Sequence, residues 1–159
     1  MMVMHMLARI ENALVLPEHI RHFADPVFRG LTSLIFIVGG VGHFGQHRMM
    51  LDRMAESPWR DVVEKIGSPS LLLWMSGAVF VVFGITLALG LLTRLSALLL
   101  FVTLVPVTIV VHVAPGHVGP FFKNIAIMGA LIFFFAHGSG RHAIDTRVLR
   151  IKALSQAPV

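Results

Sequence analysis

The sequence contains no cysteine, and only 13% of its 159 residues are charged. Without a thiolate, the chain has no dithiol chemistry of its own and cannot hold an iron–sulfur cluster through cysteine. For the same reason it cannot be a small disulfide-bonded scaffold. Soluble proteins carry about twice this share of charged residues. A chain of this length in water would have to expose many of its apolar side chains, so a soluble domain is excluded.

Apolar residues are correspondingly abundant. Hydrophobic residues make up 56% of the chain, and the mean hydropathy is +0.83, which is typical of an integral membrane protein. The 13 Lys and Arg residues outnumber the 8 Asp and Glu residues. In a membrane protein such an excess orients the spans and contacts anionic lipid head groups. We therefore expect lipid as a partner, and no nucleic acid.

Four apolar segments predict an all-α fold, an integral membrane four-helix bundle with short amphipathic interfacial helices. The expected spans are about 26–46, 70–92, 94–113 and 120–137. The first helix is expected to begin at Asp25-Pro26, because Asp caps free N–H groups and Pro suits the first helical position. The second and third spans are nearly continuous, so they must form a tight antiparallel hairpin with Arg94 at its tip.

Two amphipathic segments flank these spans. Met6 or Leu7, with Ile10 and Leu14, recur at helical spacing before Pro17, which predicts a helix lying on the membrane surface. A second short helix is expected from Ser57-Pro58 and would cap the outer end of the bundle. Met1 to Pro17 is not expected to be a secretory signal, because Arg9 and Glu11 interrupt its apolar run.

Four spans place both termini on one side of the membrane. That side, which includes Arg94, holds eight Lys and Arg residues, and the other side holds five. The positive-inside rule then predicts cytoplasmic termini in the inner membrane of a prokaryote. The expected organisation is an amphipathic cytoplasmic segment (1–24), a four-span membrane domain (25–145) and a basic cytoplasmic tail (146–159).

Several short motifs follow one another along the chain. They are Arg29-Gly30 with Phe36, Gly40 and His43; Gly67-Ser68-Pro69 before Trp74; the hairpin Gly90 to Leu95; His112; Lys123-Asn124; and Gly140-Arg141 leading to Asp145. In this order, from about Arg29 to Asp145, the chain resembles the DoxX family of small four-helix membrane proteins. The resemblance implies a link to membrane redox work, including quinone-reducing thiosulfate oxidation and assemblies that protect against oxidants.

Two positions depart from the pattern of that family. Phe80 stands where many members have an acidic residue in the second span, and His43 stands where many have lysine. An ion-coupled transporter needs an ionisable group inside the membrane. The absence of an acid at position 80 therefore argues against proton or cation transport through the bundle.

Polar residues at the outer ends of the spans form two overlapping candidate sites. The ring carbonyls of a quinone, or a lipid head group, could be bound by His43, His112, Lys123 and Asn124, with Trp74, Phe121 and Phe122 lining the ring pocket. Copper or zinc could be bound by His43, His47, His112 and His117, with Met49, Met50 and also Met54 as thioether ligands that favour Cu(I). At the opposite end, Arg94, Arg141 and Asp145 could form a structural ion pair.

These residues leave three interpretations of function. The first is a non-catalytic accessory or anchoring subunit of a membrane redox complex linked to quinone. The second is a quinone-binding redox subunit that uses the outer polar ring, with electrons supplied by another chain. The third is a copper or zinc handling protein. Catalysis by this chain alone is not expected, and neither is haem between His43 and His112, because two lone histidines at helix ends are a poor signature.

Overall fold

A computed structural model describes residues 1–113, 118–140 and 142–148. This part of the chain is mostly helical and contains no strand. The helices are α1 (Met2–Ala13), α2 (Glu18–Gly45), α3 (His47–Ala55), α4 (Arg60–Ile66), α5 (Pro69–Leu89), α6 (Thr93–His112) and α7 (Val118–His137). Residues 144–148 add a final helical turn.

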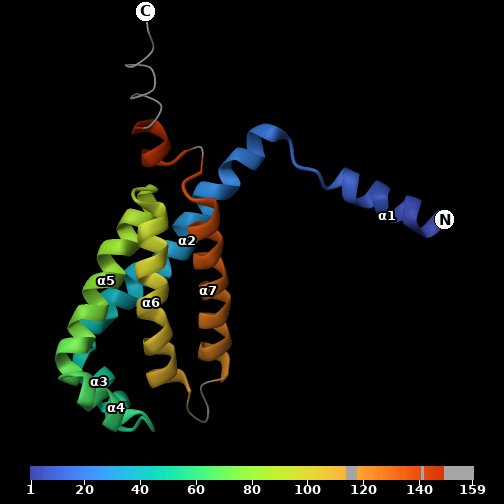
Figure 1. Cartoon of the computed structure of the whole chain (residues 1–159). Helices are drawn as coiled ribbons and strands as arrows, with labels where there is room; N and C mark the ends of the chain where they lie inside the picture. Colours follow the sequence, from blue (N-terminus) through green and yellow to red (C-terminus); the bar gives the residue numbers. More distant parts are fainter. Residues whose placement is uncertain (114–117, 141, 149–159) are drawn as a thin grey trace, which may run out of the picture.

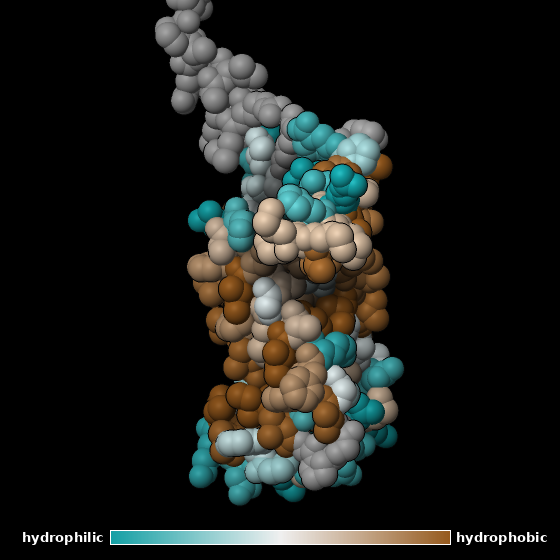
Figure 2. Space-filling view, turned by 90° about the vertical axis from the view of Figure 1, so that its right-hand side faces the viewer, coloured by the Kyte–Doolittle hydropathy of each residue, from teal (hydrophilic) through white to brown (hydrophobic). Residues whose placement is uncertain are grey.

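Four of these helices are long and apolar enough to cross a membrane. They comprise Ile20–Gly45 of α2 and the whole of α5, α6 and α7, which confirms the expected four-helix membrane bundle. Figure 1 shows both described ends of the chain at one end of the bundle and α3 and α4 at the other. Figure 2 shows a broad apolar belt between two polar ends, the distribution that a bilayer requires.

Helix α2 begins at Glu18, so the predicted start at Asp25-Pro26 is wrong. Pro17 precedes the helix, and Pro26 lies inside it. Pro26 has no amide hydrogen and removes one helical hydrogen bond. Within a membrane helix this loss is tolerated where neighbouring groups replace the missing bond. The Asp25-Pro26 pair therefore does not mark the start of α2, because Pro26 lies inside the helix.

The α5–α6 connection is the tight hairpin that the sequence predicts. Gly90 ends α5 in the left-handed conformation with φ +67°, and Leu92 precedes α6 with φ 49°. A Cβ on Gly90 would lie 2.5 Å from the Cβ of Ala143 and 2.7 Å from Nη1 of Arg29. Glycine is thus required here both by the backbone conformation and by the close approach of two other segments.

Helices α2 and α5 cross at glycines. A Cβ on Gly40 would lie 2.8 Å from the carbonyl oxygen of Gly77, and a Cβ on Gly77 would lie 2.8 Å from the Cβ of His43. Beside this crossing, Phe36 and Phe80 pack edge to face with ring centroids 5.3 Å apart. The main core continues from them towards α6 and α7, through Leu87, Ala97, Leu100, Leu104, Leu131 and Phe134.

Helices α3 and α4 close the end of the bundle away from the termini. Helix α4 begins at Arg60, slightly later than predicted, and its Val63 packs with Met54 of α3 and Leu73 of α5 in a second small core. Helix α3 was not predicted as a separate element. At the other end, α1 has no buried residue and projects away from the bundle (Figure 1).

Candidate functional site

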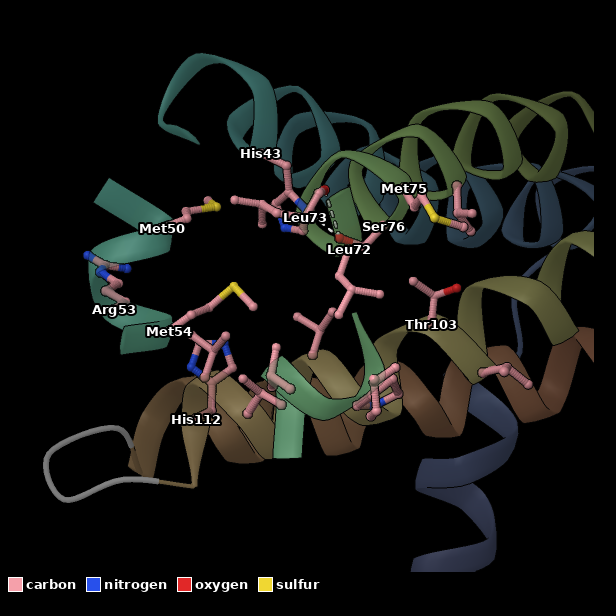
Figure 3. Close-up of a pocket in the computed structure, with 18 residues that line it drawn as sticks. His43, Met50, Arg53, Met54, Leu72, Leu73, Met75, Ser76, Thr103 and His112 are labelled. Carbon is pink, nitrogen blue, oxygen red and sulfur yellow. Dashed lines mark hydrogen bonds between the residues drawn. The ribbon is translucent and has the colours of Figure 1, made fainter. Parts of the chain in front are cut away.

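A cavity of about 520 Å³ lies where α3 and α4 meet the halves of α5 and α6 that are distant from Gly90. Figure 3 shows His43, Met50, Met54, Ser76 and Thr103 around it, with His112 at one end. Its volume is within the range of small-molecule sites, roughly 300–1,000 Å³, and most of its wall is aliphatic.

The cavity follows from the geometry of the α5–α6 hairpin. The two helices are tightly joined at Gly90 and lie farther apart towards α3 and α4 (Figure 1). Along the resulting wedge, the facing side chains are too small to fill the space, as at Ser76, Val79 and Thr103. Met50 and Met54 of α3 close the wide end.

The mouth of the cavity is formed by side chains that are themselves exposed. Met75 of α5 and Val102 of α6 are each 57% exposed, and Ile66 of α4 is 71% exposed. All three are apolar, and the two long helices cross the membrane. An apolar molecule dissolved in the bilayer could therefore enter between α5 and α6 without passing through water.

His43 is the polar group that the fold places most firmly at this cavity. Its side chain is only 7% exposed, and its ring lies 5.4 Å from that of Phe80. Its Nδ1 lies 3.0 Å from Oγ of Ser76 and 3.3 Å from the carbonyl oxygen of Leu73. The glycine at position 77 leaves room for this approach. The imidazole is consequently fixed in one orientation.

His47 does not share this cavity, although it lies one turn after His43. Its Nδ1 donates to the carbonyl oxygen of His43 at 3.3 Å, and its Nε2 accepts from the hydroxyl of Ser70 at 2.9 Å. Its ring packs against Trp74, with centroids 5.1 Å apart. Both ring nitrogens are thus engaged in the neutral form, so a metal ion would have to displace one of these bonds.

The residues predicted to bind a quinone lie in three places. His43 and His112 line the cavity. Trp74 lies outside it, 48% exposed, and packs on Phe44 at 4.9 Å. The third group, on α7, does not line the cavity: Lys123 and Phe122 are exposed, and Phe121 packs on Phe122.

Asn124 has a structural role in this arrangement. It is buried on α7, and its Nδ2 donates to Oγ1 of Thr108 at 2.9 Å. That hydroxyl in turn donates to the carbonyl oxygen of Leu104 at 2.7 Å. The amide therefore links α7 to α6. The cavity is lined neither by Lys123 and Asn124, which were expected to bind the ligand, nor by the expected ring-pocket residues Trp74, Phe121 and Phe122.

The residues predicted to bind copper or zinc are only partly brought together. His43, His112 and Met50 line the same cavity, whereas Met49 is 43% exposed outside it. His117 lies outside the described residues. Within the part of the chain that the structure describes, no three residues among His, Cys, Asp and Glu group as metal ligands would.

The hairpin tip and the C-terminal segment meet through a helix cap, and among the described residues Arg94 forms no ion pair with Asp145. The carboxylate of Asp145 accepts from the amides of Leu92 and Thr93, at 2.9 and 3.1 Å, and so caps the N-terminus of α6. Arg94 instead approaches the carbonyl oxygen of Ala136, with Nη2 at 3.4 Å. Arg141 lies outside the described residues.

The structure also places an ion pair that the sequence analysis did not predict. Arg29 is 2% exposed, and its Nη1 lies 3.6 Å from Oδ2 of Asp25, one helical turn away. The spacing of four residues was the signal that could have revealed it. Gly140 packs directly against the Asp25 carboxylate, so the pair lies beneath the returning C-terminal segment.

Most of the cavity lining was not predicted from the sequence, and Met54 was expected there only as a further thioether ligand for copper. Met54 recurs four positions after Met50, which places both thioethers on one face of α3. Thr103, Val107 and Val110 recur at helical spacing on α6 and form one wall. These spacings can be recognised in the sequence, but the residues line a cavity only because α5 and α6 diverge from their hairpin.

Comparison with known proteins gives one match. The sequence model of the DoxX family matches residues 24–113, which run from within α2 past the end of α6. Every residue that lines the cavity lies inside the match, and α7 lies outside it. Comparisons with curated proteins and with solved structures returned no match.

Proposed function

This chain belongs to the DoxX family of membrane proteins, and from that premise we propose that it is a non-catalytic membrane subunit of a quinone-linked redox complex, holding the quinone head group in the cavity between α3, α4, α5 and α6. The observation that carries the proposal is the cavity itself. It is largely aliphatic, its mouth is apolar, and His43 is fixed at its wall.

A quinone suits such a site for three chemical reasons. Its ring is apolar and fits a volume of about 520 Å³. Its two oxygens form hydrogen bonds with a small number of polar groups. Its isoprenoid tail remains in the bilayer, to which the cavity mouth is adjacent. The proposal places the subunit in the cytoplasmic membrane of a prokaryote, where such quinones are dissolved in the lipid.

The same proposal assigns the electron chemistry to a partner. The chain has no cysteine, so it cannot pass electrons to a quinone through a dithiol or a thiolate-bound cluster. A partner subunit would supply them. The membrane redox assemblies implied by the family resemblance support this division of roles, in which the bundle anchors the complex and presents the quinone.

The test compares two variants on α6. In Thr103→Phe a ring is added at the cavity wall, whereas in Ile109→Phe the same side chain is placed on the exposed, lipid-facing side of the same helix. Each protein is extracted gently from its native membrane, and bound quinones and copurified proteins are identified by mass spectrometry. We expect stoichiometric quinone and redox subunits with wild type and Ile109→Phe, and at least tenfold less quinone with Thr103→Phe.

Two results would count against this function. Wild-type protein that carries no more quinone than an unrelated membrane protein extracted in parallel would refute binding in the cavity. Quinone retained equally by both phenylalanine variants would place the ligand elsewhere. Absence of any stoichiometric redox subunit would separately refute the accessory role.

A further inference from the structure

We infer that His43 presents a hydrogen-bond acceptor to the cavity, and that the cavity therefore binds the reduced, dihydroxy form of its ligand more tightly than the oxidised, dicarbonyl form. This inference rests on the proposed function and deepens it, because it names the redox state that the site selects. The selected chemical class is a quinol or, more generally, a phenol whose hydroxyl group can donate.

The argument starts from the proton on the imidazole. A backbone carbonyl oxygen can only accept, so Nδ1 of His43 must be the donor in its contact with the oxygen of Leu73 at 3.3 Å. The hydroxyl of Ser76 also donates to that oxygen, at 3.0 Å. The hydroxyl proton of Ser76 is therefore engaged, and Oγ of Ser76 is a second acceptor for Nδ1 of His43, at 3.0 Å.

The other ring nitrogen then has a defined role. In a neutral imidazole only one nitrogen carries hydrogen, and here it is Nδ1. Nε2 of His43 is left with a lone pair, and the structure shows no hydrogen bond to it from the described residues. The side chain lines the cavity. A ligand atom beside Nε2 is thus bound favourably only if it donates.

Two other polar side chains at the cavity, those of Thr103 and Arg53, do not reverse this preference. Thr103 has a hydroxyl group, which can donate to a carbonyl or accept from a ligand hydroxyl. Arg53 only donates, and the oxygen of either a carbonyl or a hydroxyl accepts from it. Thr103 and Arg53 can therefore form hydrogen bonds with the oxidised and with the reduced form equally well. Of these three groups only His43 distinguishes them, because a carbonyl oxygen opposite Nε2 would place two acceptors against each other. His112 also lines the cavity, and the variant His43→Asn separates its contribution from that of His43.

The consequence is a difference in affinity between the two redox states. An acceptor left unsatisfied in a buried site weakens binding substantially, and we expect the quinol to bind roughly tenfold more tightly than the matching quinone. A tenfold preference raises the two-electron potential of the bound pair by about 30 mV. The site would accordingly stabilise the product of quinone reduction.

The experiment measures both forms on the full chain in phosphatidylcholine nanodiscs. A short-chain benzoquinone is added under oxidising conditions, and its quinol is added anaerobically with excess reductant. Retention is compared with that of empty nanodiscs to obtain the two dissociation constants. The critical variant is His43→Asn, since an Asn amide can replace Nδ1 opposite Leu73 and Ser76 but has no atom at the position of Nε2.

A matched control comes from the far end of the bundle. In His137→Asn the same change is made at an exposed histidine on α7, whose Nδ1 also contacts a backbone carbonyl oxygen, that of Phe133 at 3.0 Å. We expect the quinol preference in wild type and His137→Asn, and a ratio close to one in His43→Asn, with quinol affinity falling about tenfold and quinone affinity nearly unchanged.

The outcomes separate this inference from the proposed function. If neither form binds wild-type protein above empty nanodiscs, the quinone function itself fails. If both forms bind with equal affinity, or the quinone binds more tightly, the site exists but the assigned tautomer of His43 is wrong. A quinol preference that persists in His43→Asn would also overturn the inference, because another group would then be the acceptor.

Discussion

Asp145 connects the C-terminal segment to the hairpin through a single carboxylate. It accepts from two free amides at the N-terminus of α6, where an acceptor also interacts favourably with the helix dipole. We expect Asp145→Ala to destabilise the protein by about 1 kcal/mol. For a chain of this size the thermal unfolding midpoint in detergent should then fall by about 2–4 °C.

The control for this prediction is Glu11→Ala, which removes an acid from α1, a helix with no buried residue. Its unfolding midpoint should match that of wild type. Asp145→Asn should lie between wild type and Asp145→Ala, because the amide oxygen retains one acceptor for the cap. If all three variants melt together, the cap contributes nothing to stability and the contact is incidental.

Adjacent glycines on α2 provide a test at the scale of helix packing. A Cβ on Gly40 would meet the backbone of Gly77 at 2.8 Å, whereas a Cβ on Gly39 would meet nothing within 4 Å. Backbone cannot move aside as a flexible side chain can, so Gly40→Ala should destabilise the protein by about 1–3 kcal/mol. Gly39→Ala should be neutral or slightly stabilising, since alanine favours helix over glycine.

The same pair of variants connects packing to the site. His43 lies one turn after Gly40 and contacts the α5 segment around Gly77. If Gly40→Ala moves α2 away from α5, the ring should lose its fixed orientation, and quinol retention should fall together with the unfolding midpoint. Equal stability and equal retention in both glycine variants would show that this crossing is looser than the structure indicates.

The presence of the long helices was easier to predict from the sequence than the residues at which they begin. A long apolar run must cross the membrane as a helix, so α5, α6 and α7 follow from hydropathy alone. The start of α2 does not, because Asp25-Pro26 satisfies the local rules for a helix start while the helix already runs from Glu18. Helix α3 was missed for another reason: it is short and polar, and its Met50 and Met54 acquire a buried face only when they close the cavity.

The candidate site could be predicted only in part, because it depends on tertiary geometry. The sequence places His43 and His112 near one membrane level, and in the structure both line one cavity. Which way a side chain points around its helix axis is a different question. Trp74 and Asn124 are on suitable helices at suitable depths, yet one packs on Phe44 and the other bonds to Thr108. The direction of each side chain depends on the rotation of its helix about the helix axis and on the divergence of neighbouring helices. A single sequence gives little information about either.

At the scale of the whole molecule, the orientation in the membrane decides where a redox partner can dock. The absence of cysteine allows a direct measurement, because any single introduced cysteine is then the sole target for a membrane-impermeant maleimide. Glu11→Cys and Val148→Cys report the end of the bundle that holds the termini, and Glu56→Cys reports the end that holds the cavity; all three positions are exposed.

The positive-inside rule predicts that intact cells label only Glu56→Cys, and that Glu11→Cys and Val148→Cys react after the membrane is permeabilised. This pattern would place the cavity near the outer leaflet, so a partner that exchanges electrons with the bound quinone would dock on the outer side, close to α3 and α4. The reverse pattern would put that partner in the cytoplasm. Labelling of Glu11→Cys and Val148→Cys from opposite sides would contradict the four-span bundle itself, since an even number of spans returns the chain to the side on which it began.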